Sequence, residues 1–412
     1  MKVAVIGGGI AGLSAAWRLQ GHGCQVELFE QEDRLGGHTD THAINVAQGS
    51  VQIDTGFIVF NELNYPQFSQ WLSELNVRSQ PSHMSFAVRD ERSGLEYGTG
   101  DLQAILANRR QALRPDFWRL WWDLTRFYKS LRSGPIPDCS VGDYLSAEGY
   151  GRAFIDSHIV PMCAALWSQP MSQSLQLSLR HVVEFMRNHR MLQVSARPSW
   201  RVVQGGSSCY VDAFAQSFSG VVHLGAEVST IQRTASQVFV GNASSEDKVF
   251  DAAILACHSD QALAALSMPT AVEQAVLGAI AYQPNQIYLH SDTTFMPRHR
   301  DCWSSWNVTR GQDDEYTITY WMNELQGLTC TESFFVTLNP PRVPKEVHWQ
   351  GAYAHPQFTQ QSYAAQQRWS EISAGRIQYA GAYWGAGFHE DGFVSGIRAA
   401  DQLLQSELSR AA

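Results

Sequence analysis

The stretch Lys2-Val-Ala-Val-Ile-Gly-Gly-Gly-Ile-Ala-Gly12 decides the fold of this chain. Residues 2–6 form a short apolar run that predicts a buried strand. Gly7, Gly9 and Gly12 then make a G-x-G-x-x-G turn. The first glycine permits a tight turn, the second lets the backbone approach a pyrophosphate, and the third lets helix and strand pack closely. Helix-forming residues come next, so we expect phosphate to meet the N-terminus of a helix.

The residues after this turn complete a βαβ unit. A turn at residues 21–23 precedes a second predicted strand at residues 25–29, which ends at Glu30. An acidic residue at that place accepts hydrogen bonds from the ribose of a dinucleotide. The alternative is that residues 2–17 are the apolar core of a signal peptide, but the glycine triplet and the missing small-residue cleavage site oppose it. The sequence therefore predicts a dinucleotide site.

The composition limits the class of protein. The chain has 412 residues, 44% of them hydrophobic and 17% charged, which is enough for two compact domains. The sequence has no apolar run of about eighteen residues to predict a membrane span, and the formal net charge of −9 disfavours nucleic acid as a partner. The seven cysteines are scattered without a C-x-x-C pair, so we expect no metal site and a reducing, cytoplasmic location.

The α/β pattern occurs three times, separated by two insertions. We therefore expect a nucleotide-binding domain made of residues 1–80, 196–280 and 371–412, and a substrate domain made of residues 81–195 and 281–370. The expected helices lie at 62–76, over most of 101–192, and at 391–408. The expected strands lie at 221–224, 227–231, 238–241, 250–256, 285–290, 302–308, 315–322, 333–338 and 376–380.

Four blocks of this chain resemble the flavin amine oxidase and phytoene desaturase superfamily. They are the glycine turn with Glu30, then Arg34-Leu-Gly-Gly-His-Thr-Asp-Thr41, then Trp200-Arg-Val-Val-Gln-Gly-Gly-Ser207, and residues 380–396. The second and fourth blocks are the most specific, because they match segments that support the flavin half of FAD. The resemblance implies non-covalently bound FAD in a Rossmann-like domain of the glutathione-reductase type, built from three chain segments. The second domain would be α+β, with helices and an antiparallel sheet.

The resemblance also implies which residues bind FAD. Gly36 and Gly37 would let the backbone pass the pyrophosphate while Arg34 offers a cation. A helix beginning near Glu390 would point its positive end at the flavin. The implied cofactor-binding residues are Gly7, Gly9, Ile10, Ala11, Gly12, Glu30, Gln31, Arg34, Gly36, Gly37, His38, Thr39, Val228, Gly381, Gly387, Phe388, His389 and Glu390.

The chain departs from the superfamily pattern at three points. Ala382 stands where an acidic residue usually binds a ribityl hydroxyl. None of the four lysines, Lys2, Lys129, Lys248 and Lys345, matches the lysine that many amine oxidases place near flavin N5. The aromatic residue that those enzymes set over the flavin falls at Phe388, which has no hydroxyl. These departures favour an apolar substrate over an amine.

Two strings resemble a bacterial subgroup that is linked to methyl-branched fatty acyl chains and furan fatty acids. They are Asp-Thr-Gly-Phe-Ile-Val-Phe-Asn at residues 54–61 and the segment at residues 381–392. The resemblance implies an FAD-dependent oxidoreductase that desaturates a hydrophobic, lipid acyl substrate by hydride transfer to flavin N5. The alternatives are an amine oxidase and a lipid-binding carrier of the same fold that performs no redox chemistry.

The catalytic residues are less clearly indicated than the cofactor site. The candidates are Phe388, Trp384, His38 and Asn61, with no residue indicated as the catalytic base. The residues expected to line the substrate cavity are Asn61, Met84, Phe86, Trp306, Asn323 and Trp384. Oxygen, a quinone and a partner protein are all open as electron acceptor. NAD(P)⁺ is disfavoured, because no complete second G-x-G-x-x-G occurs.

Residues 114–132 form the clearest amphipathic helix in the sequence. Phe117, Leu120, Trp121, Leu124, Phe127, Tyr128 and Leu131 share one face, while Trp118, Trp122 and several basic residues lie off it. One interpretation is an ordinary helix that buries the stripe in the core of the substrate domain. The other is a peripheral contact with the inner face of a membrane, since tryptophan and basic residues suit that interface.

Overall fold

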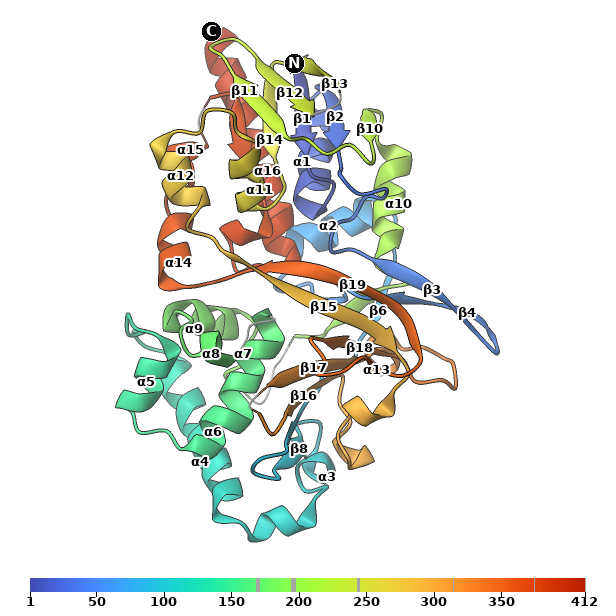
Figure 1. Ribbon diagram of the computed structural model, residues 1–412, viewed down its shortest axis with the longest axis vertical. Helices are drawn as coiled ribbons and strands as arrows, with labels where there is room; N and C mark the ends of the chain where they lie inside the picture. The colour runs from blue at the N-terminus through green and yellow to red at the C-terminus, as the bar shows by residue number, and fades with distance from the viewer. Residues whose placement is uncertain (168–170, 194–197, 243–244, 314, 374, 412) are drawn as a thin grey trace.

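The computed structural model of the chain describes residues 1–167, 171–193, 198–242, 245–313, 315–373 and 375–411. The molecule has an upper half that contains both termini and a lower half that contains the helices α3–α9 and a large sheet (Figure 1). The long strands β15 (Tyr282–His290) and β19 (Val347–Pro356) pass between the two halves. The predicted α/β class, with antiparallel sheet in addition, is confirmed.

The upper half is built on a five-stranded parallel sheet with the order β10-β2-β1-β14-β20. Its central strand is β1, the run that opens the chain. Apart from Lys2 at its start, β1 is fully buried, and so are β14 and β20, because both faces of a parallel sheet are covered. The carboxyl ends of all five strands meet at one edge, where ligands bind in such sheets. The strands are β1 (Lys2–Ile6), β2 (Gln25–Phe29), β10 (Val221–His223), β14 (Ala252–Leu255) and β20 (Ile377–Tyr379).

The side chains of β1 alternate between two cores. Val3 and Val5 pack with the helices α1, α2, α10 and α16, while Ala4 and Ile6 pack with α11, α12, α15 and the β11–β12–β13 sheet. α1 and α16 approach closely, and the Ser14 hydroxyl donates to the Phe393 carbonyl at 2.9 Å. The upper elements are α1 (Ile10–Gly21), α2 (Pro66–Glu74), α10 (Ser208–Ser217), α11 (Ser259–Ala265), α12 (Ala271–Leu277), α14 (Gln360–Gln366), α15 (Trp369–Ile372), α16 (His389–Ala411), β11 (Thr230–Arg233), β12 (Val238–Asn242) and β13 (Ser245–Phe250).

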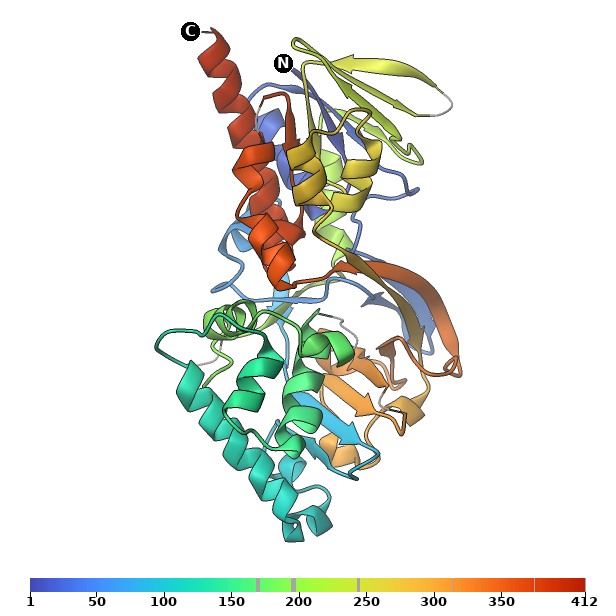
Figure 2. The ribbon, with the colours of Figure 1, turned by 60° about the vertical axis from the view of Figure 1, so that its left-hand side comes forward.

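The lower half packs a layer of helices beside a seven-stranded sheet with the order β19-β15-β18-β17-β16-β7-β8 (Figure 2). Its strands pair antiparallel except β16 with β7. The remaining strands are β7 (Phe86–Asp90), β8 (Glu96–Gly98), β16 (Trp306–Arg310), β17 (Tyr316–Trp321) and β18 (Phe335–Leu338). The helices are α3 (Leu102–Ile105), η1 (Arg109–Leu113), α4 (Pro115–Leu131), α5 (Val141–Ala147), α6 (Arg152–Phe154), η2 (Ile155–Ile159), α7 (Val160–Trp167), α8 (Met171–Ser174) and α9 (Leu179–Asn188). Within the described residues, none of the helices is long and apolar enough to cross a membrane.

The buried carboxylate of Asp54 ties distant segments together between the halves. It accepts hydrogen bonds from the Thr41 hydroxyl at 2.5 Å, from Ser207 N at 2.8 Å and from the Gln326 amide at 2.9 Å. Burial nevertheless raises the pKa of Asp54 to about 6. The elements that meet here are β3 (Thr41–Val46), β4 (Gly49–Asp54), β5 (Val59–Phe60), β6 (Ser79–Pro81), β9 (Arg201–Val203) and α13 (Met322–Gln326).

Several expected boundaries are wrong. Residues 227–229 precede β11, which begins at Thr230. The strand expected at 302–308 begins at Trp306, because residues 300–302 form the short helix η4 (Arg300–Cys302). The β3–β4 hairpin and β19 were not expected. Their side chains are mostly half-exposed, so the hydrophobic alternation that marks a strand is weak in them.

Candidate active site

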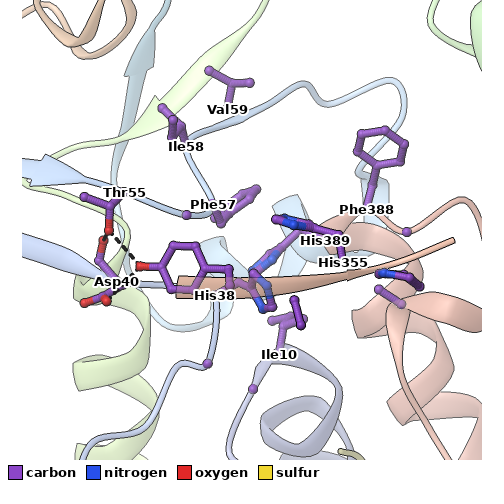
Figure 3. A pocket seen from close by; sticks show the side chains of 18 of the residues that line it. Ile10, His38, Asp40, Thr55, Phe57, Ile58, Val59, His355, Phe388 and His389 are labelled. Atoms are coloured by element: carbon purple, nitrogen blue, oxygen red, sulfur yellow. Dashed lines mark hydrogen bonds between the residues drawn. The ribbon is translucent and has the colours of Figure 1, made fainter. Parts of the chain in front are cut away.

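One cavity of about 1910 Å³ runs from the carboxyl edge of the parallel sheet into the lower half. Sites for a single small molecule are typically about 300–1,000 Å³. The cavity is therefore large enough for a dinucleotide at its upper end and a second molecule at its lower end. Figure 3 shows where the two ends meet, with His38, His355 and His389 close together beside Ile10.

Backbone atoms of the two glycine turns, Gly7–Gly9 and Gly36–Gly37, form the upper end of the cavity, which we call the cradle. Gly36 N donates to Gly8 O at 2.8 Å, which joins the two glycine turns. A side chain on Gly7 would collide with the Ala256 carbonyl at 2.7 Å, and one on Gly37 would approach Gly9 Cα at 3.2 Å. By contrast, a Cβ on Gly9 would meet nothing within 4 Å. Gly9 therefore faces open cavity at the first turn of α1, where backbone N–H groups have no partner within the helix.

Glu30 and Arg34 hold the cradle in shape. The Glu30 carboxylate accepts from Gly8 N at 2.6 Å and from Glu32 N at 3.0 Å, and it lines the cavity, where its remaining lone pairs can accept from a ribose. Arg34 pairs with Asp40 at 2.9 Å and donates to Gly37 O at 3.0 Å. Its charge is thus already matched by Asp40, although its side chain lines the cavity.

Most residues expected to bind the cofactor do line the cavity. They are Gly7, Gly9, Ile10, Ala11, Glu30, Gln31, Arg34, Gly36, Gly37, His38, Val228, Gly381, Gly387, Phe388 and His389. Gly12, Thr39 and Glu390 are absent from the lining.

These three residues instead support the walls. A Cβ on Gly12 would lie 1.8 Å from the Gly7 carbonyl, so this glycine packs α1 against the turn. The Thr39 hydroxyl bonds to the hydroxyl of Tyr210. The Glu390 carboxylate accepts from Gln67 N at 3.0 Å and Phe68 N at 2.9 Å, and so caps α2. The Glu390 side chain is thus engaged with α2, and its contact with the cofactor stays a prediction.

Three of the six residues expected to line the substrate cavity do so, namely Met84, Phe86 and Trp306. Asn61 closes a turn, with its side-chain oxygen accepting from Asn64 N at 2.9 Å. The side-chain amide of Asn323 donates to the Glu332 carbonyl at 2.7 Å. Trp384 packs against Tyr383 in the core of the upper half. Of the catalytic candidates, Asn61 and Trp384 therefore lie outside the lining, while His38 and Phe388 lie in it.

Neutral histidines surround the junction between the two ends. The His38 ring lies 5.2 Å from that of His355, measured between centroids. Burial holds the pKa of His38 well below its usual value, and burial lowers the pKa of His355 to about 4 and that of His389 to about 3. The buried Nε2 of His38 has no hydrogen-bond partner among the described residues. A buried polar atom without a partner suits a bound polar ligand, and so does the open space at Gly9.

Hydrogen bonds set the tautomer of His355. The Asn339 amide donates to Asn285 Oδ1 at 2.6 Å, so Asn285 turns its own amide hydrogens toward His355 Nδ1, 2.8 Å away. Nδ1 must therefore accept, and in the neutral ring the proton resides on Nε2. His355 presents an N–H donor to the cavity that it lines.

His189 is a site residue that no sequence pattern indicated. It follows α9 and lies against Phe185 and Phe388, with ring centroids 3.9 and 5.9 Å away. Its Nδ1 donates to the Phe185 carbonyl at 3.0 Å, so the neutral ring carries a bare lone pair on Nε2. This Nε2 is buried, has no partner within the part of the chain that the structure describes, and belongs to a residue that lines the cavity. Burial lowers the pKa of His189 to about 4.

The lower end of the cavity is mostly apolar. Phe388 stacks on Phe185 with centroids 4.4 Å apart. The other apolar side chains that line this end include Ile58, Phe86, Trp121, Leu124, Met162, Trp306 and Tyr320. The carboxylates in the described lining, Glu30, Glu32, Asp40, Glu227 and Asp260, all come from segments of the upper half. The described lining contains no lysine.

The upper cradle, the unpartnered His38 Nε2 and the open space at Gly9 fit the expected FAD. Its pyrophosphate would be held by the backbone at Gly9 and Gly37, and its ribose by Glu30. The flavin would lie toward Phe388 and the N-terminus of α16, whose dipole favours negative charge there.

The chain is similar to known proteins, over a short stretch in sequence and over nearly its whole length in fold. The chain is 43% identical over 74 residues to the FAD-dependent oxidoreductase dbaF of Emericella nidulans, a match that spans 18% of this chain and 15% of that protein. Its fold is similar to that of the cyclohexylamine oxidase from Brevibacterium oxydans IH-35A, with a TM-score of 0.72, 15% identity and 99% of both chains covered. It is also similar to that of the CLA-producing fatty acid isomerase from P. acnes, with a TM-score of 0.69, 11% identity and 98% of both chains covered.

The comparison with protein families covers most of the molecule. The family described as flavin containing amine oxidoreductase matches residues 10–336 and 311–404, which include Gly36 and Gly37 of the cradle, the lower half and most of α16. The chain therefore belongs to the flavin-containing amine oxidoreductase family and is an FAD-dependent oxidoreductase.

Proposed function

We propose that this oxidoreductase desaturates a lipid acyl chain. The observation that carries the proposal is the lower wall of the cavity, where aromatic and aliphatic side chains meet no carboxylate among the described lining residues. A protonated amine is held most strongly by a carboxylate, which the described lining of the lower end lacks, whereas an acyl chain needs apolar surface alone. Phe388, stacked on Phe185, offers such a surface without a hydroxyl.

Two hydrogens leave the substrate in this reaction. One of them would leave as a hydride, for which FAD would supply the acceptor when it is bound at the upper end. The other leaves the neighbouring carbon as a proton, and His189 Nε2 is placed to receive it, because the ring is neutral and its lone pair is free of partners among the described residues. The electron pair of that C–H bond becomes the new double bond.

The substrate class rests on the resemblance of residues 54–61 and 381–392 to the subgroup linked to methyl-branched acyl chains. It is consistent with a fold shared with a fatty acid isomerase. Amine oxidation is the second candidate, favoured by the likeness of the fold to that of cyclohexylamine oxidase.

Anaerobic flavin reduction distinguishes the two. The purified holoenzyme is mixed with methyl-branched acyl phospholipids, or with primary amines and polyamines, while the absorbance near ~450 nm that is general for oxidised flavins is followed. We expect bleaching with the acyl lipids, with a double bond found in the product by mass spectrometry. Bleaching by an amine, with every acyl lipid silent, would overturn the proposal.

A further inference from the structure

An apolar tip lies at the end of the lower half, far from both termini (Figures 1 and 2). It comprises residues 102–122, from α3 through η1 to the first two turns of α4. Five large apolar side chains of this segment are exposed to solvent: Leu102 (75%), Leu106, Leu113 (86%), Trp118 (57%) and Trp122 (67%). Soluble proteins rarely gather exposed apolar residues in this way unless the surface binds something.

The structure separates the two faces of α4. Phe117, Leu120 and Phe127 are fully buried, so the amphipathic stripe belongs to the core of the lower half. Trp118 and Trp122, one turn apart, face outward instead. These two tryptophans are therefore not part of the buried stripe, and packing within the chain does not account for their presence.

The charge around the tip is opposite to that of the whole molecule. Residues 101–132 contain seven basic and three acidic residues, in a chain with a formal net charge of −9. Two of the acids, Asp116 and Asp123, are paired with Arg114 and Arg119 inside the segment. Arg109 and Arg110, between Leu106 and Leu113, are exposed. Basic residues among exposed tryptophan and leucine side chains match an anionic lipid surface.

The same segment forms a wall of the cavity. Ile105, Trp121, Leu124 and Tyr128 line its lower end. Trp121 lies in α4 between Trp118 and Trp122, so a single helix separates the exposed tip from the cavity. A lipid held at the tip would be one helix away from the place where an acyl chain is expected.

We propose that residues 102–122 dock on an anionic lipid bilayer and that the acyl chain passes from the bilayer into the cavity past Ile105 and Trp121. The docking rests on the tip itself, while the passage of the acyl chain rests on the proposed function. A protein partner or a second copy of the chain are the other occupants that the test distinguishes.

The test is binding of the FAD-loaded protein to vesicles by co-sedimentation. Vesicles of phosphatidylglycerol and phosphatidylcholine are compared with vesicles of phosphatidylcholine alone, at low and high salt. We expect binding to the anionic vesicles that weakens with salt, and a loss of at least about tenfold in affinity for Trp118→Ser/Trp122→Ser. Arg109→Gln/Arg110→Gln should weaken binding to the anionic vesicles selectively.

The matched control is Met268→Ser/Val343→Ser, which removes two exposed apolar side chains elsewhere (79% and 64% exposed) and should bind like the wild type. No binding to any vesicle, or equal binding by the tryptophan variant, would overturn the proposal. Gel filtration completes the test: a wild-type dimer that becomes a monomer in the tryptophan variant, without vesicle binding, would assign the tip to contact between copies. Vesicle binding together with no flavin reduction by acyl lipids would keep the docking and reject the substrate.

Discussion

The two ends of the cavity recognise their ligands by different means. The upper end offers a ligand the backbone at Gly9 and Gly37 and one carboxylate, that of Glu30. The lower end offers side chains, such as Phe388 and Trp306, that segments far apart in the sequence supply. Backbone N–H groups suit any phosphate, whereas the side chains that line a cavity can change with the substrate. The comparison explains why one cofactor fold can serve substrates as different as amines and acyl chains.

The largest effect is expected for Gly9→Asp, which should greatly weaken FAD binding at the upper end of the cavity. The backbone at Gly9 has φ −77° and ψ 179° at the N-cap of α1, where aspartate is a favoured residue, and a Cβ meets no atom within 4 Å. The apoprotein should therefore fold, while the carboxylate repels the pyrophosphate and FAD binding falls by at least about a hundredfold. Flavin content and circular dichroism check both parts. The control is Gly21→Ala at the far end of the same helix, which should remain yellow; a yellow Gly9→Asp protein would contradict the cradle.

The substitution His189→Phe tests the lower end of the cavity without altering the cofactor site. Phenylalanine keeps the stack on Phe185 and removes the Nε2 lone pair, so flavin content should be unchanged while anaerobic flavin reduction slows about 10²–10⁴-fold. The wild-type rate should be constant above about pH 5 and fall as pH falls through about 4, because His189 is then protonated. His181→Phe, on the same helix but outside the lining, is the control. Equal rates in both variants would remove His189 from the reaction.

A smaller effect is expected at the junction between the halves, where Asp54 should make the free energy of unfolding depend on pH. The pKa of Asp54 is raised by burial to about 6, so the folded protein binds this proton more tightly than the unfolded chain. The resulting stability is present at low pH and is lost as pH rises through the window from about 4 to 6. The free energy of unfolding of the wild type should therefore fall relative to that of Asp54→Asn by about 3 kcal/mol across this window. Denaturant unfolding at several pH values measures it, and a difference that rises with pH would show that the carboxylate is stabilised by its donors.

The smallest predicted effect concerns Glu390, and it tests whether this residue supports the wall of the cavity or binds the cofactor. Glu390→Ala should cost about 1 kcal/mol in the free energy of unfolding, because the N-terminus of α2 loses its cap. FAD affinity should stay within about twofold, because the side chain is not part of the lining. FAD titration of the apoprotein checks this expectation. A large drop in affinity without loss of stability would return Glu390 to the cofactor site.

The predicted site residues that lie outside the cavity lining do so for a common physical reason. Glu390 and Asn61 lie beside motif residues that line the cavity, but neighbouring side chains on a helix or turn point in different directions. Trp384 follows Gly381 closely, yet its ring packs in the core of the upper half. A motif fixes the path of the backbone at such places, and the direction of each side chain depends on what it packs against.

The sequence by itself determined the βαβ unit and the three-part return to one sheet, because an apolar strand, a G-x-G-x-x-G turn and a helix follow local rules. FAD as the cofactor came instead from the resemblance of residues 34–41 and 380–396 to the flavin-supporting segments of the superfamily. Only the tertiary structure decided that His189 presents a bare nitrogen near Phe388 and that the apolar stripe of α4 is core while Trp118 and Trp122 are exposed. Those properties depend on burial and on hydrogen-bond partners supplied by distant segments, and neither is written in the spacing of residues along the chain.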